Sequence, residues 1–408
     1  MCTTKFPFNL FGIIAGILLV SSSLLSNAQP GPDVFFEGNP YENGQQLDPN
    51  FIDSQDAPKI QVVFALDVTG SMSGLLSAAK DKIWSIATSL AQAENSPQIS
   101  MGIVAYRDRG DDFVTKIIDL NTDLDLVYSQ LMALSAGGGG DTPESVNQAI
   151  FDAVTRISWD NNQNTMRTIF LVGDCPPHMD YPDDVKYPES CRMANEKDIT
   201  INTILMGNSG GAISSWQSIA SNGSGDFIQA GMDAGSLAIS TPYDEEIKRK
   251  SAALEQTKIH YGEKETRKVK DATVEEKVHV AETMAPEAAA RRATYLNTTS
   301  SGSAAAYDDG ELINDIAKGK VKLEEIAVDD LPDELAEMDE EERVHYVDTM
   351  ISNRNQTEVE LNELIRQRDS HIENEISVIS TENSFTWNVF NSLKNQADKK
   401  KIKMAATP

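Results

Sequence analysis

The sequence predicts an α/β fold between residues 58 and 235, a doubly wound and mostly parallel sheet with one antiparallel edge strand. Short apolar runs rich in Val and Ile alternate along this segment with stretches whose apolar residues recur at helical spacing. The apolar runs are nearly continuous, which is typical of strands covered on both faces. Strands that alternate with helices in this way imply a parallel sheet with helices on both sides.

The first strand and the first helix are the clearest of these elements. Residues 60–66 form the run Ile-Gln-Val-Val-Phe-Ala-Leu, and residues 74–91 carry apolar side chains every three or four positions. Further strands are predicted at 100–107, 115–120, 166–173, 200–207 and 226–230, and further helices at 124–134, 144–157 and 213–220. Because no helix separates 100–107 from 115–120, we expect these two strands to form a hairpin at one edge of the sheet.

The N-terminus predicts export. Residues 1–28 combine Lys5, an apolar stretch at 11–20 and a small-residue site at 26–28, which is the pattern of a cleaved secretory signal peptide. The apolar stretch is short and lacks a cationic flank after it, so a stable membrane anchor is not expected. We therefore expect a secreted or periplasmic protein. Residues 29–57 are rich in Pro and Gly and lack apolar periodicity, which predicts a linker.

The C-terminal part of the chain predicts an extended α-helical region. Between residues 236 and 330 the apolar density falls and Glu, Lys, Ala and Thr dominate, so we expect a low-complexity, partly helical linker. Apolar residues return at helical spacing in residues 331–408, interrupted by charged side chains. This pattern favours a helical hairpin or a short, imperfect coiled coil, which would offer a surface for self-association.

Charge and cysteine content narrow the function classes. The chain has 63 acidic and 35 basic side chains and a formal charge of −28, so it repels a phosphate backbone and nucleic acid is not expected as a partner. Cys2 lies in the predicted signal peptide, which leaves Cys175 and Cys191 in an oxidising compartment. An even pair there predicts a disulfide, and two unpaired buried thiols are the alternative.

Oxygen-bearing side chains follow three predicted elements. Residues 67–71, Asp-Val-Thr-Gly-Ser, end the first strand, a glycine run at 137–140 leads into a predicted helix, and Asp174 follows the strand at 166–173. Open α/β sheets bind ligands at the carboxyl ends of their strands, and Mg²⁺ prefers oxygen ligands. Each residue alone could be a helix cap or a solvated turn residue, but together they predict a metal site formed by Asp67, Thr69, Ser71, Thr142 and Asp174.

These three loops resemble the metal-ion-dependent adhesion site of the von Willebrand factor A domain family. The matching strings are Asp-x-Thr-Gly-Ser at 67–71, Gly-Gly-Asp-Thr-Pro-Glu at 139–144 and Gly-Asp-Cys-Pro-Pro-His-Met at 173–179. The resemblance covers residues 58 to about 235. Within the family, the chain looks similar to a secreted bacterial branch.

The resemblance implies a divalent ion, usually Mg²⁺, with Mn²⁺ or Ca²⁺ as alternatives. The hydroxyls of Ser71, Thr142 and Thr69 would hold the ion, and Asp67 and Asp174 would bind it directly or through water. Thr69 stands where many members of the family have Ser, which retains the hydroxyl.

Four further residues are predicted to form the rim of the binding face: Asp108, Asp111, Asp141 and His178. The string Arg109-Gly110-Asp111 is better explained as a charged turn than as an adhesive ligand. His178 has no second ligand at helical spacing, so a second metal or a general base is not expected there.

The predicted function is therefore that of a non-enzymatic adhesion or scaffold protein whose metal site captures an exposed acidic residue of a partner protein. No catalytic residue is predicted, because the chain lacks a Gly-x-Ser-x-Gly elbow, a phosphate-binding loop and a His-Glu-x-x-His motif. The alternative is a metal-dependent hydrolase that uses the same site to activate water.

Overall fold

The computed structural model describes residues 59–91, 97–140, 142–230, 240–298, 302–303, 306–307, 310–378 and 385–404. All of them lie in the second of two units of the chain, Asp53–Pro408. The predicted signal peptide, the predicted linker at 29–57 and the predicted rim residue Asp141 lie outside the described residues.

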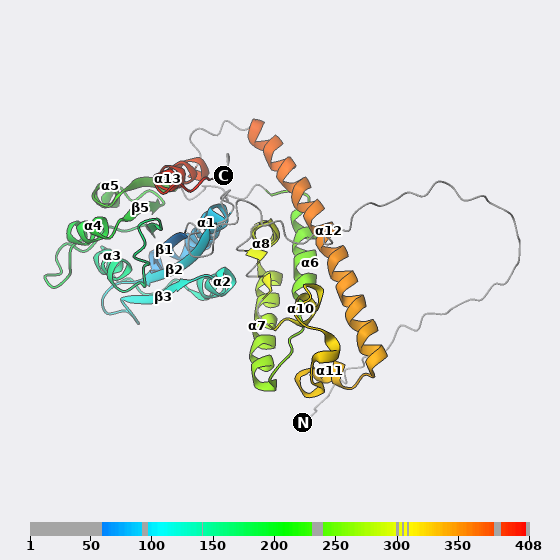
Figure 1. Cartoon of the computed structure of the whole chain (residues 1–408). Coiled ribbons are helices and arrows are strands. Elements are labelled where there is room, and N and C mark those ends of the chain that lie inside the picture. Colours follow the sequence, from blue (N-terminus) through cyan, green and yellow to red (C-terminus); the bar gives the residue numbers. More distant parts are fainter. Residues whose placement is uncertain are drawn as a thin grey trace, which may run out of the picture. The chain divides into compact units, whose positions relative to one another are not determined.

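A six-stranded sheet forms the centre of the N-terminal half (Figure 1). Its strands are β1 (Lys59–Asp67), β2 (Gln98–Tyr106), β3 (Thr115–Asn121), β4 (Met166–Gly173), β5 (Ile199–Met206) and β6 (Ser224–Ala230). The strand order is β3-β2-β1-β4-β5-β6, and every neighbouring pair is parallel except β2 and β3. The predicted fold class, with its antiparallel edge strand, is confirmed.

Helices cover both faces of this sheet. The helices over the sheet are α1 (Leu76–Ala91), α2 (Leu124–Ala133), α3 (Val146–Thr155), α4 (Tyr187–Glu196) and α5 (Gly210–Asn222). Alternate β1 residues enter different cores: Phe64 packs in the core with α1 and α2, and Val63 packs in the core with α3 and α5. Burial on both sides explains the continuous apolar run of this strand. The sequence did not predict α4, because only Ser190, Cys191 and Ala194 of this helix are buried.

Residues 240–330 are more ordered than predicted. They form α6 (Asp244–Glu255), α7 (Lys264–Thr283), α8 (Pro286–Thr298), α10 (Leu312–Ala317) and the short 3₁₀ turns η2 (Leu323–Glu325) and η3 (Val328–Asp330). Met284 and Tyr295 join the same core as Trp84 of α1. The predicted helical character is present, but the segment is not a linker. Its alanines made α8 resemble low-complexity sequence, whereas Ala290 and Ala293 are buried and pack with Ile247 and Leu361.

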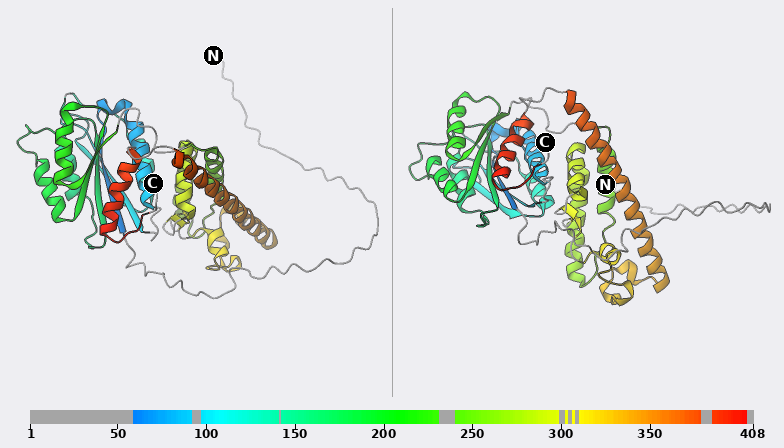
Figure 2. Two further views of the ribbon diagram at one scale, coloured as in Figure 1. Left: turned by 90° about the horizontal axis from the view of Figure 1, so that it is seen from above. Right: turned by 45° about the horizontal axis from the view of Figure 1, so that its top comes forward.

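The last two long helices do not form the predicted hairpin. After the short helix α11 (Asp333–Ala336), α12 (Glu340–Val378) packs on α6 and α8, whereas α13 (Phe385–Lys399) packs on β6 and α1. Figure 2 shows α13, in red, beside the sheet. Leu361 and Ile365 of α12 are buried within their own chain, so they do not offer the predicted seam for self-association.

The far end of the chain therefore completes the sheet domain. Val389, Phe390 and Leu393 of α13 lie in the same core as the α1-facing side of β1. Asn202 of β5 accepts hydrogen bonds from Ser392 Oγ (3.2 Å) and Gln396 Nε2 (3.0 Å). The helices between residues 240 and 378 form an insertion between β6 and α13. Within the described part of the chain, no helix has both the length and the apolar character needed to cross a membrane.

Candidate metal centre

Four of the five predicted metal ligands lie together at the carboxyl ends of β1 and β4. The backbone N–H and the hydroxyl of Thr69 both donate to Asp67 Oδ1, at 2.9 Å and 2.6 Å. Thr69 Oγ1 lies 3.0 Å from Ser71 Oγ, and Ser71 Oγ donates to Asp174 Oδ1 at 2.9 Å. Two carboxylates and two hydroxyls from separate loops thus lie in one row, in which each hydroxyl donates to a carboxylate and the two hydroxyl oxygens are in contact.

The glycine run passes directly against the first of these loops. Gly70 N donates to Gly138 O at 3.0 Å, and Gly137 N donates to Val68 O at 3.0 Å. Gly139 has φ +72°, and a Cβ there would lie 3.1 Å from Thr69 Cβ, so a side chain would be both strained and crowded. Thr142 follows this run and is exposed, and its side chain makes no hydrogen bond to any described residue. The run brings the Thr142 loop to the site without fixing the Thr142 hydroxyl in it.

Several buried polar atoms in and beside these loops have no hydrogen-bond partner among the described residues. They include Asp67 Oδ2, Tyr106 Oη, Glu144 Oε2 and His178 Nε2. Burial raises the pKa of Asp67 to about 7, and although the hydrogen bonds from Thr69 oppose this, the charge of Asp174 adds to it. Orphaned buried oxygens of this kind are unfavourable unless a further group satisfies them.

Sequence reasoning missed Glu144. Its side chain is only 1% exposed, and Oε1 would lie 3.0 Å from a Cβ on Gly139, so its carboxyl group faces the glycine run beside Thr69. The pKa of Glu144 is raised to about 8. Burial is the largest cause, and the negative charge of Asp67 is the next largest. The residue appeared in the sequence as an ordinary first-turn glutamate, and nothing in the local pattern showed that it points inward.

The donor set fits a hard divalent cation. Mg²⁺, Mn²⁺ and Ca²⁺ prefer oxygen ligands and negative charge. The carboxylates and hydroxyls of these loops supply both. Within the described part of the chain no three His, Cys, Asp or Glu side chains are grouped closely enough to bind a metal by themselves. The hydroxyls of Thr69 and Ser71 must therefore be part of any site here.

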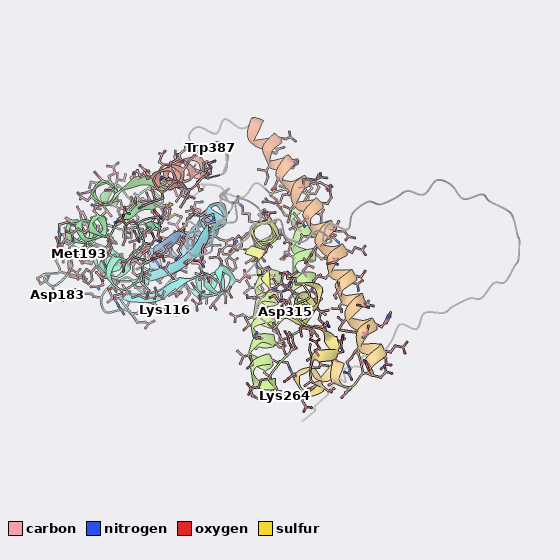
Figure 3. All side chains as sticks on the ribbon, viewed as in Figure 1. Lys116, Asp183, Met193, Lys264, Asp315 and Trp387 are labelled. Carbon is pink, nitrogen blue, oxygen red and sulfur yellow. The ribbon has the colours of Figure 1, made fainter. Side chains whose placement is uncertain are left out.

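Two of the predicted rim residues are buried instead. Asp108 is 2% exposed and His178 is 3% exposed. Asp108 accepts hydrogen bonds from neighbouring loops, and His178 Nε2 lies 3.4 Å from Asp108 Oδ2. Asp111 turns inward and accepts a hydrogen bond from Gly139 N at 2.8 Å. Arg109 pairs with Asp184 and with Asp183, which lies on the loop between β4 and α4 (Figure 3). Arg109 and Asp111 thus both make contacts within the domain, which fits a charged turn.

The predicted disulfide is absent from the structure, in which Cys175 and Cys191 are both free and buried. The two thiols face different surroundings: Cys175 Sγ lies 3.9 Å from Ser71 Oγ, and Cys191 Sγ lies 3.7 Å from Ile219 O in the core under α5. Burial raises the pKa of each thiol to about 12, which keeps both protonated at neutral pH.

Residues 61–241 match the family model of the von Willebrand factor A domain. Among solved structures, the chain is similar to a von Willebrand factor type A protein from Catenulispora acidiphila, with 16% identity, a TM-score of 0.34, and coverage of 42% of this chain and 38% of that one. It is also similar to proximal thread matrix protein 1 from the mussel byssus, solved with a zinc-occupied MIDAS motif, with 14% identity, a TM-score of 0.33 and coverage of 43% of each chain.

One curated protein shares sequence with a short part of the chain. A putative ariadne-like RING finger protein of Acanthamoeba polyphaga mimivirus is 28% identical over 119 residues, which are 29% of this chain and 11% of that protein. The chain spans well under two thirds of each of these proteins. The family match over residues 61–241, together with the sheet order and the antiparallel β3, identifies this part of the chain as a von Willebrand factor A domain.

Proposed function

We propose that this domain binds a partner protein by capturing one of its exposed acidic side chains through a divalent cation. The observation that carries the proposal is Asp67, whose Oδ1 accepts two hydrogen bonds from Thr69 while its buried Oδ2 has no partner among the described residues. A cation beside Oδ2 would satisfy this oxygen and offset the neighbouring charge of Asp174.

The chain's own residues divide the work of holding that cation. Thr69, Ser71 and Thr142 would contribute hydroxyl oxygens, and Asp67 and Asp174 would contribute negative charge. A bound Mg²⁺, Mn²⁺ or Ca²⁺ supplies a coordination position that a carboxylate of the partner can occupy. Ser71 and Thr142 are exposed, so the partner would approach from the side on which these two hydroxyls lie.

The setting we propose is outside the cytoplasm, because the N-terminal 28 residues have the composition of a secretory signal peptide. The net charge of −28 disfavours nucleic acid as the partner and is compatible with an exported binding protein. On this proposal the protein acts as an adhesion or scaffold component in the periplasm or outside the cell.

The test removes both carboxylates and leaves the hydroxyls. In the double variant Asp67→Ala/Asp174→Ala we expect Mg²⁺ and Mn²⁺ affinity, measured by titration calorimetry, to fall by orders of magnitude while the far-UV circular dichroism is unchanged. The matched control is Asp119→Asn, since Asp119 on β3 accepts hydrogen bonds from Ser158, and neither residue belongs to these loops. Metal binding that survives in the double variant would refute the site.

The second candidate function is a metal-dependent hydrolase, and Glu144 is the observation that favours it. A buried carboxyl group with a pKa of about 8 beside a metal site has the properties of a general base. Phosphate-ester and carboxylate-ester hydrolysis by the Mg²⁺-loaded protein, abolished in Glu144→Gln, would support catalysis. Equal background rates in the two proteins would support binding alone.

A further inference from the structure

One buried carboxylate, Asp108, links the loops that carry the proposed metal ligands. It follows β2 and accepts a hydrogen bond from Ser145 Oγ at Oδ1 (2.8 Å) and from Tyr181 Oη at Oδ2 (3.0 Å). Ser145 stands three residues after Thr142, and Tyr181 lies on the loop that begins with Asp174. Asp108 thus receives a donor from each of two ligand-bearing loops while contributing no ligand itself.

Backbone contacts join the same two loops beside Asp108. Glu144 N donates to Pro176 O at 3.0 Å, and His178 N donates to Glu144 O at 3.1 Å, which forms a short parallel bridge. The rings of His178 and Tyr181 stack with their centroids 4.0 Å apart, and the Arg109 guanidinium lies 4.2 Å from the Tyr181 centroid. Tyr181 and His178 of this stack both contact Asp108, which is 2% exposed.

The turn that contains Asp108 also holds the glycine run. Asp111 Oδ2 accepts hydrogen bonds from Asp108 N at 3.2 Å and from Gly139 N at 2.8 Å. The neighbouring Gly138 accepts a hydrogen bond from Gly70 N, in the loop that carries Thr69 and Ser71. All three ligand loops are therefore connected, directly or through the glycine run, to the turn at 107–112.

We infer that Asp108 is a positioning residue of the metal site, an inference that rests on the proposed function. Asp108 holds the Thr142 and Asp174 loops at the separation that metal binding requires. A buried carboxylate is costly unless hydrogen bonds satisfy it, so the two hydroxyl donors of Asp108 are held toward it. Partners that orient metal ligands typically change metal affinity by about 10- to 100-fold when they are substituted.

The experiment measures Mn²⁺ and Mg²⁺ affinity of the full chain by titration calorimetry, with thermal unfolding of the metal-free protein in parallel. Asp108→Asn keeps the size of the side chain but places an NH₂ where an acceptor is needed, and we expect affinity to fall about 10- to 100-fold. Ser145→Ala and Tyr181→Phe each remove one donor without changing the charge, so any loss of affinity in them reports positioning rather than electrostatics. Because both act through Asp108, Ser145→Ala should cost little more in the Asp108→Asn background.

Each outcome decides the question. If wild type binds metal and all three variants bind it with wild-type affinity, the inference is overturned and the proposed function stands. If wild type binds no divalent cation, the proposed function fails instead. Should Asp108→Asn fail to fold, the two charge-neutral variants decide alone. Asp119→Asn removes a carboxylate that is bound by a hydroxyl outside the metal site, and it should leave metal affinity unchanged. If it lowers metal affinity as much as Asp108→Asn does, the effect is a general one on folding.

Discussion

Gly173, the last residue of β4, shows how much the site depends on single positions. A Cβ there would lie 2.5 Å from Tyr106 Oη and 2.8 Å from Asp67 Cβ, both closer than carbon side chains normally approach. The strand that delivers Asp174 can end beside Asp67 only because this residue has no side chain. Nothing in the sequence distinguished this glycine from one required by a turn.

We predict that Gly173→Ala destabilises the protein by about 1–3 kcal/mol, since the added methyl group must displace Asp67 or Tyr106. Metal affinity should fall as well, because the displaced groups belong to the site. The measurements are urea unfolding followed by tryptophan fluorescence and calorimetry with Mn²⁺. Gly74→Ala is the control, because a Cβ at Gly74 meets no atom within 4 Å. Equal stability of the two variants would contradict this account of Gly173.

Strand-end logic predicted Asp67, Thr69, Ser71 and Asp174 correctly as neighbours, since parallel strands deliver their last residues to one edge. It did not predict the positions of Asp108, Glu144 and His178. Polar residues are usually exposed, and the burial of these three depends on hydrogen bonds between loops distant in sequence. Local patterns carry no information about such pairings.

At the scale of elements, α8 is attached to the sheet domain by a buried ion cluster. Arg292 donates to both oxygens of Asp125 on α2, at 2.6 Å and 2.7 Å, and to Glu255 on α6 at 2.7 Å. Burial is the largest single effect and would raise the pKa of Asp125 and Glu255. The charge of Arg292, together with hydrogen bonds and the charge of Lys258, outweighs it and holds both pKa values below their ordinary range. The cluster connects three helices, of which two belong to the insertion.

We predict that Arg292→Met costs about 3–5 kcal/mol at pH 7, because it removes the cation that pairs with both buried carboxylates and leaves only Lys258 beside Glu255. The folded pKa values lie below the unfolded ones, so this contribution is present above the unfolded values near pH 4 and is lost as the pH falls through the folded ones. The stability difference between variant and wild type should therefore shrink below about pH 4. Chemical unfolding at a series of pH values measures it.

The control is Arg249→Met, because Arg249 pairs with Glu246 on an exposed helix face. This variant should lose much less free energy of unfolding, and the loss should be nearly independent of pH. A pH-independent penalty for Arg292→Met would show that packing, not charge, is what the arginine contributes.

At the scale of the whole molecule, the core around the sheet is built from two separate parts of the chain. Residues 59–230 form the sheet and five of its helices, and α13 returns to the same core after the insertion. The polar contacts of Asn202 with Ser392 and Gln396 fix which face of α13 meets the sheet. A truncated chain that ends near residue 240 would leave the core around Phe390 open.

We predict that Leu393→Ala lowers the free energy of unfolding of the sheet domain by about 2–5 kcal/mol, because Leu393 is buried in its core. Asn388→Ala, on the exposed face of the same helix, should change it by no more than about 0.5 kcal/mol. Thermal unfolding monitored at the tryptophans provides the comparison. If both variants unfold like wild type, α13 does not belong to the domain.

The sequence predicted the sheet because each strand carries its own apolar run, and local periodicity is what such reasoning detects. It did not predict the role of α13, whose apolar face is that of any amphipathic helix, and the choice between pairing with α12 and covering the sheet depends on Asn202, nearly two hundred residues earlier. The alanine-rich face of α8 was missed for a related reason, because small residues reveal close helix packing only when the partner helix is known.

The return of α13 bears on when the domain can fold. Translation proceeds from the N-terminus, so β6 leaves the ribosome long before residues 385–404 do, and the sheet must wait for its last covering helix. Contacts between such distant segments also slow folding, because a long loop must close before they form. We therefore expect a nascent chain to keep the part of the sheet that α13 covers exposed until residues 385–404 have been synthesised, which would leave that surface available to chaperones.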